Sequence, residues 1–221
     1  MKFLAMISLI CSLVFTHQVN AAATLIDFEG LQDREQILDF YNGGTGSLGS
    51  SGADIGISFS EGALALIDSD SGGIGNFANE PSGDTIAFWQ SGDSIIMNIN
   101  NGFTDGFSFF YTSFTTAEIN IWSGLNATGS MLGTLMLSAQ YNDNCSGDPT
   151  GVFCNWSAAG LDFAGTALSI DFGGTANNTG YDNITLGSST PINTTPIPAA
   201  VWLFISGILG VSGLSRRKTQ V

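Results

Sequence analysis

The sequence predicts an all-β fold, a jelly-roll or lectin-like β-sandwich, and three observations support this. Glycine is abundant, with 29 among 221 residues, and charged residues make up only 11% of the chain. Short runs of Phe, Ile, Thr and Ser end repeatedly at Gly, Asn or Asp. Runs of β-branched and aromatic residues that stop at turn formers are typical of short strands joined by tight turns. Many such runs in one domain suit two packed sheets.

The expected strands are those runs in which apolar and polar residues alternate, because alternate side chains of a strand share one face of a sheet. The segment Asp33–Phe40 has a different apolar spacing, which indicates a helical turn. The expected strands are, in chain order, Leu25–Phe28, Ile55–Phe59, Ala63–Ile67, Thr85–Trp89, Ser94–Ile99, Gly106–Tyr111, Thr116–Trp122, Leu132–Ser138, Phe153–Trp156, Ala167–Phe172 and Tyr181–Leu186.

Both ends of the chain differ from this central domain. Residues 1–23 have the organisation of a secretory signal peptide: Lys2, then an apolar run from Phe3 to Phe15, then small residues suited to cleavage by signal peptidase. The β-sandwich domain is expected over residues 24–187. Residues 188–195 form a polar, proline-containing linker that we expect to be extended and exposed.

The C-terminal segment, residues 196–218, has three parts: a Pro-x-Pro break, an apolar stretch at 199–214, and a basic cluster at 216–218. An α-helix over the apolar stretch would be roughly 24 Å long, slightly shorter than a bilayer core of about 30 Å. A basic cluster after such a helix predicts a transmembrane anchor with its cations on the cytoplasmic side. The alternative is a buried C-terminal core helix.

The order of residues in this segment resembles the PEP-CTERM sorting signal of Gram-negative bacteria, in the subclass that reads Val-Pro-Leu-Pro-Ala. It departs at Ile197, where the name-giving motif has Glu, and at Ile205, where Gly is usual. The resemblance implies export through the inner membrane, anchoring there, and then processing by an exosortase-type protease that leaves the protein at the cell surface or in the extracellular matrix. The residues that carry the signal are Pro196, Pro198, Ala199, Ala200, Trp202, Phe204, Gly207, Arg216, Arg217 and Lys218.

The central domain also resembles known domains in its short motifs. The motifs at residues 27–31 and 181–184 are similar to those of the β-sandwich domains that PEP-CTERM proteins often carry, which resemble carbohydrate-binding modules in architecture. This implies a non-enzymatic protein of the cell surface or of an exopolysaccharide biofilm matrix. The alternative is a carbohydrate-binding module, with or without a dependence on Ca²⁺.

The charged residues of the domain restrict its chemistry. Between the two terminal segments the chain has one arginine, nineteen acidic residues, no lysine and no histidine, a formal net charge of −18. This charge repels nucleic acid. Without histidine, neither a Ser-His-Asp nor a Cys-His nucleophile system can form. A pair of carboxylates, as in glycosidases, is the remaining catalytic arrangement, but the sequence nominates no pair. We therefore expect no enzymatic activity.

Two cysteines remain in the exported domain, Cys145 and Cys154, in a turn-rich segment. Disulfides form by default in oxidising compartments, so we expect these two residues to close a stapled loop.

Two groups of residues are candidate ligand sites. Asp182 and Ile184 are alternate residues of one expected strand, so their side chains should lie on the same face, towards the core. A carboxylate in the core needs backbone donors or a cation. If the first and last strands pair, Asp27 or Glu29 would lie near Asp182, and these oxygens could hold a structural Ca²⁺. The alternative is that Asp182 caps the turn after residues 177–180 through main-chain N–H groups. Tyr41 and Trp89 are candidates for stacking on sugar rings, with burial in the core as the alternative.

Overall fold

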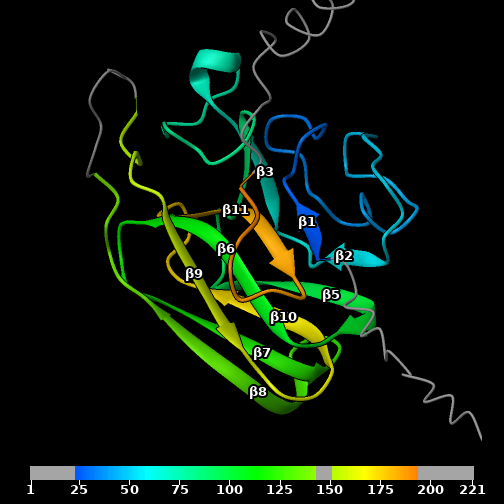
Figure 1. Ribbon diagram of the computed structural model, residues 1–221. Helices are drawn as coiled ribbons and strands as arrows, with labels where there is room; N and C mark the ends of the chain where they lie inside the picture. The colour runs from blue at the N-terminus through cyan, green and yellow to red at the C-terminus, as the bar shows by residue number, and fades with distance from the viewer. Residues whose placement is uncertain (1–22, 143–150, 194–221) are drawn as a thin grey trace, which may run out of the picture.

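The computed structural model describes residues 23–142 and 151–193, which form two antiparallel sheets packed face to face (Figure 1). The expected all-β sandwich is therefore confirmed. The signal peptide up to residue 22, Cys145 and the sorting segment 196–218 lie outside the described residues. In the part of the chain that the structure describes, no helix is long and apolar enough to cross a membrane.

Sheet A has six strands and sheet B has five. The order in sheet A is β3 (Leu64–Ile67), β4 (Thr85–Phe88), β11 (Thr179–Leu186), β6 (Gly106–Ser113) and β9 (Ser157–Asp162), with β1 (Thr24–Ile26) also beside β11. The order in sheet B is β2 (Ile57–Phe59), β5 (Ser94–Phe103), β10 (Ala167–Gly173), β7 (Ala117–Gly124) and β8 (Thr128–Leu137).

The two sheets enclose a core rich in aromatic rings. The rings of Trp89 and Tyr181 are parallel, with centroids 6.1 Å apart, and Phe109 and Phe172 pack edge-on or tilted around Tyr181. The Tyr181 hydroxyl donates a 2.7 Å hydrogen bond to the Gly173 carbonyl, which satisfies its polar atom in the apolar interior. This core explains why a domain with so many phenylalanines can leave few of them exposed.

The segment 34–41 covers one edge of each sheet. At the edge of sheet A, Arg34 N donates to Ala65 O, Ala65 N donates to Glu35 O, and Ile37 N donates to Ala63 O. At the edge of sheet B, Ile57 N donates to Tyr41 O, and Phe59 N donates to Leu38 O. The helical turn expected over Asp33–Phe40 is therefore wrong; the segment forms successive turns and a bridge between Gln36 and Leu64. Pairing to two sheet edges competes with local helical hydrogen bonds for the same backbone groups.

Ten of the eleven expected strands overlap an observed strand, and one does not. The run Phe153–Trp156 is not a strand, although Phe153 makes an isolated bridge to Phe77. The strand β9 begins directly after it, at Ser157. Small residues dominate β9, so its sequence carries little of the alternation that indicates a strand.

Asp182 does not point towards the core, contrary to the expectation from parity. The pairing of β11 with β6 shifts register between Asp182 and Thr185, and Asn183 has a left-handed φ of 49°. This bulge interrupts the alternation on which the expectation depended. Asp182 pairs with Phe110, which lies outside the core cluster, so both face outward from sheet A.

The beginning of the expected linker packs on the outer face of sheet A. Ser108 Oγ donates to the Ser188 carbonyl at 2.8 Å, and Ile192 N donates to Thr185 Oγ1 at 3.0 Å. Gly160 leaves room for this segment, because a Cβ there would collide with the Ser189 carbonyl. The expectation of a wholly exposed linker is therefore wrong for residues 188–192, most of which are partly buried.

Candidate functional site

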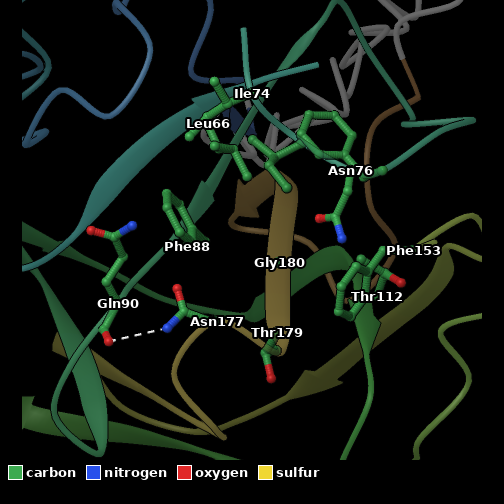
Figure 2. A pocket seen from close by; sticks show the side chains of 12 residues that line it. Leu66, Ile74, Asn76, Phe88, Gln90, Thr112, Phe153, Asn177, Thr179 and Gly180 are labelled. Carbon is green, nitrogen blue, oxygen red and sulfur yellow. Dashed lines mark hydrogen bonds between the residues drawn. The ribbon is translucent and has the colours of Figure 1, made fainter. Parts of the chain in front are cut away.

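A groove of about 260 Å³ lies on the outer face of sheet A, and Figure 2 shows the side chains around it. Its floor comes from β4 and β11, its far side from Thr112 of β6, and its walls from the segments 74–77 and 153. The residues that line it are Leu66, Ile74, Asn76, Phe77, Ile86, Phe88, Gln90, Thr112, Phe153, Asn177, Thr179 and Gly180.

Gly180 makes room for the Ile86 side chain in the floor of the groove. It lies on β11 between the surrounding side chains (Figure 2), and a Cβ there would come within 2.8 Å of Ile86 Cδ1. On β4, Ile86 and Phe88 face outward while Ala87 faces the core, so alternation of the strand presents two apolar side chains to the groove. The groove therefore has an apolar floor in which Ile86 lies over Gly180.

One wall of the groove is a pair of loops that hold each other. The Asn76 carbonyl accepts hydrogen bonds from Val152 N at 2.7 Å and from Phe153 N at 3.1 Å. Trp156 Nε1 donates to the Ala78 carbonyl at 3.1 Å. The Trp156 ring also packs edge-on against Phe77, with centroids 6.3 Å apart. These contacts fix the position of Phe153, which neither loop could hold alone.

The polar groups around the groove are neutral. Asn76, Gln90 and Asn177 are exposed amide side chains, and none of the described lining residues is ionisable. Asn177 is held in place because its main-chain N donates to the Trp89 carbonyl at 2.8 Å. Thr112 Oγ1 is buried and has no hydrogen-bond partner among the described residues. The three exposed amides offer both donors and acceptors to a ligand, whereas the Thr112 hydroxyl is covered.

A second site of interest is the junction where β4 and β1 meet along β11. There the Asp182 carboxylate accepts hydrogen bonds from Ser82 N at 3.1 Å, from Ser82 Oγ at 3.3 Å and from Asn183 N at 2.6 Å. Burial raises the pKa of Asp182 to about 8, and these hydrogen bonds only partly oppose that effect. The nearby charge of Glu29 raises this pKa further.

Glu29 is bonded in a similar way. Its Oε1 accepts from Asp84 N at 3.0 Å and from Thr85 N at 2.9 Å. Partial burial raises its pKa, and the charge of Asp27 adds to that effect. The predicted pairing of the first and last strands is confirmed, and it brings Asp27, Glu29 and Asp182 close enough to influence one another.

These three residues do not form a ready calcium site. Ca²⁺ usually takes six to eight oxygen ligands, whereas the oxygens of Asp182 and Glu29 already accept main-chain and hydroxyl hydrogens. The described residues also contain no group of three or more acidic, cysteine or histidine side chains arranged to hold a metal ion. Asp182 does accept main-chain hydrogen bonds, as the alternative expected, but from Ser82 and Asn183 and not from the turn at residues 177–180.

The two residues expected to stack on sugar rings belong to the core. Trp89 is fully buried, and Tyr41 is 6% exposed, with its hydroxyl accepting a 2.9 Å hydrogen bond from Phe28 N. The prediction that these two residues stack on sugar rings is therefore wrong, because neither presents a ring face to solvent. The aromatic side chains of the groove are Phe77, Phe88 and Phe153 instead. No sequence signal singled them out, since Phe88 looks like any other strand residue.

Cys154 is buried and disulfide-bonded. Its expected partner, Cys145, lies outside the described residues, so that pairing stays a prediction. Cys154 directly follows Phe153, and a covalent tie there would restrain the wall of the groove.

A second hollow, of about 450 Å³, lies at the side of the sandwich between the edges of the two sheets, next to Ile57, Phe103 and Leu186. Its polar residues Thr104 and Asp105 bond each other at 2.8 Å. Asn101 also lines this hollow, and Asp105 gives it an ionisable side chain, which the described lining of the groove on sheet A lacks.

No family model matches the sequence, and neither does any curated protein. Several solved chains are similar in shape, and two of them align as follows. A mutant of a family 29 carbohydrate-binding module aligns with a TM-score of 0.42 and 14% identity, over 80% of this chain and 99% of the module. An isomalto-dextranase of Arthrobacter globiformis, in complex with panose, aligns with a TM-score of 0.33 and 13% identity, over 75% of this chain and 32% of the enzyme.

Proposed function

We propose that this chain is an exported, non-enzymatic protein of the cell surface or extracellular matrix, and that its groove binds an uncharged glycan. The observation that carries the proposal is the composition of the groove: an apolar floor around Gly180, surrounded by neutral amides. A sugar ring has apolar C–H faces and hydroxyl groups at its edge, and each of these finds a matching surface in the groove.

The size of the groove suits one unit of a longer chain. Its volume of about 260 Å³ is near the lower limit of small-molecule sites, which hold about 300–1,000 Å³. A short site of this kind binds weakly by itself. It would gain strength from repeated units of a polymer through effective concentration.

The charge of the domain selects against anionic polysaccharides. The formal net charge of −18 repels polyanions over about one Debye length, some 8 Å at physiological ionic strength. An uncharged glycan avoids this repulsion. The described residues of the groove also lack the pair of carboxylates that glycoside hydrolysis needs, which favours binding over cleavage.

The groove is tested by removing its rim amides. We expect Asn76→Ala combined with Gln90→Ala to weaken binding about tenfold, because each lost hydrogen bond contributes about 0.5–1.5 kcal/mol. Both residues are exposed, so the unfolding midpoint should not change. The measurement is affinity electrophoresis and titration calorimetry with a dextran, a β-1,3-glucan and a galactomannan, with alginate as the anionic comparison.

The matched control is Asn101→Ala, which removes an exposed amide from β5 in sheet B and should leave binding unchanged. If none of the neutral polysaccharides binds, or if the double variant binds as well as the parent, the groove is not a glycan site.

The C-terminal segment is the proposed route to the surface, and the intact mass of the protein in its native host tests it. We expect a species that begins near Ala22 and ends near the break at residues 196–198, as sorting-protease processing requires. A membrane species that keeps residues 199–218 would contradict processing, and would leave a tail-anchored surface protein.

A further inference from the structure

The sheet edges at β2, β3 and β8 differ in whether another segment pairs with their main-chain groups. The edges at β2 and β3 are covered by main-chain hydrogen bonds from the segment 34–41. The edge at β8 has no such cover: among the described residues, β8 pairs only with β7. In Figure 1, β8 lies at the outer margin of sheet B, away from β2 and β3.

The sequence of β8 does nothing to block its free edge. Thr128–Leu137 spans ten residues and contains neither a charged residue nor a proline. Natural proteins usually protect an exposed edge strand with a charge, a proline or a very short length. The pairing of β7 with the first half of β8 has two register shifts, but the pairing from Gly133 to Leu137 is regular. At least that half of β8 is suited to accept another strand.

The region around β8 is also the neutral part of an acidic domain. Residues 106–142 contain a single charged residue, Glu118, whereas thirteen acidic residues lie between Asp27 and Asp105. The segment 34–41, which covers the opposite edges, belongs to that acidic part. A partner that binds at β8 therefore meets little charge, and the acidic surface at the covered edges stays remote from it.

Three large apolar side chains are exposed on β8 and on the turn before it. Met131 is 50% exposed, Met136 is 65% exposed, and Leu125 in the turn is 40% exposed. Met131 pairs with Trp122 and Met136 pairs with Glu118, so both methionines lie on the outer face of sheet B. Methionine is flexible and adapts to partner surfaces, which suits a contact of this kind.

We propose that β8 pairs antiparallel with β8 of a second copy, which joins the two B sheets into one continuous sheet. An unpaired row of main-chain groups requires an extended strand as partner. A two-fold symmetric contact requires a surface that complements itself. An uncharged strand meets that requirement, because no side chain on it faces a like charge. An antiparallel register centred on Leu135 uses the regular half of β8 and places Thr134 of one copy opposite Met136 of the other, both on the outer face of the sheet.

The register provides a sharp test by charge reversal. We expect the full chain, purified in a non-ionic detergent, to be dimeric by multi-angle light scattering. Thr134→Lys combined with Met136→Lys should give monomers, because like charges would then lie directly across the new strand pair. The two lysines lower the net negative charge of the domain, so a general change in repulsion would act in the opposite direction.

Thr134→Glu combined with Met136→Lys should restore the dimer, since opposite charges would then lie across both pairs while the net charge stays unchanged. The control is Leu48→Lys with Ile74→Lys, two residues that are each 57% exposed and lie outside β8, and it should remain dimeric. A parent chain that is monomeric at its highest soluble concentration overturns the proposal. So does a dimer that survives the two lysines, or a Glu–Lys variant that stays monomeric.

Discussion

Replacing Trp89 with alanine is expected to lower the free energy of unfolding by about 3–5 kcal/mol, the range for removing a large aromatic side chain from a core. The Trp89 side chain is fully buried and stacks on Tyr181. Its removal would leave a cavity between the two sheets, which the rigid strands on either side cannot close. Urea denaturation followed by far-UV circular dichroism measures this loss.

The control for this substitution is Phe114→Ala, which removes an aromatic ring that is 48% exposed. Its effect should be much smaller, because less apolar surface is taken out of contact with protein. The result also separates the two roles considered for Trp89. A residue that only stacks on sugars would leave stability unchanged when removed, and such an outcome would contradict its place in the core.

Replacing Asp182 with asparagine is expected to change how stability depends on pH. The pKa of Asp182 is about 8 in the folded protein and near 3.9 in an unfolded chain. The folded state therefore holds this proton more tightly, so its contribution to stability is fully present below about pH 4. It is lost progressively as the pH rises to about 8, and does not change further above that.

The expected measurement is a series of urea denaturations between pH 4 and pH 9. The parent should lose several kilocalories per mole across the window, since each pKa unit corresponds to about 1.4 kcal/mol. Asp182→Asn should flatten most of this slope, although the raised pKa of Glu29 leaves a smaller slope of the same sign. Asp93→Asn, an exposed loop carboxylate, is the control and should keep the slope of the parent.

The same experiment addresses calcium. Because hydrogen bonds already occupy the oxygens of Asp182 and Glu29, we expect neither Ca²⁺ nor EDTA to move the unfolding midpoint at neutral pH. A clear rise with Ca²⁺ that disappears in Asp182→Asn would instead support the calcium site predicted from Asp27, Glu29 and Asp182.

The sequence predicts most of the strands because their alternation of apolar and polar residues survives in the fold. It fails where that alternation is weak or interrupted. The small residues of β9 hide a strand, and the bulge at Asn183 reverses the face that Asp182 occupies. Parity arguments assume an uninterrupted strand, and one residue in a left-handed conformation is enough to invalidate them.

The groove could not be predicted from the sequence. Its lining comes from six separated parts of the chain, and one member, Gly180, contributes by having no side chain. The sequence predicts that Trp89 and Tyr41 stack on sugar rings because they are large aromatic residues with polar neighbours in the sequence. That property does not distinguish a buried ring from an exposed one. The burial of Trp89 depends on Tyr181, which is remote in sequence.

The pairing of β1 with β11 has a mechanical consequence. Thr24 lies opposite Leu186, so the chain enters and leaves the domain at the same point. A force that separates these two ends would open the strand pair one hydrogen bond after another, starting at Thr24, instead of straining all of them together. The domain should therefore yield at low force when pulled from both ends. A protein held by its C-terminal side alone, as the proposed sorting route implies, transmits no such load through this strand pair.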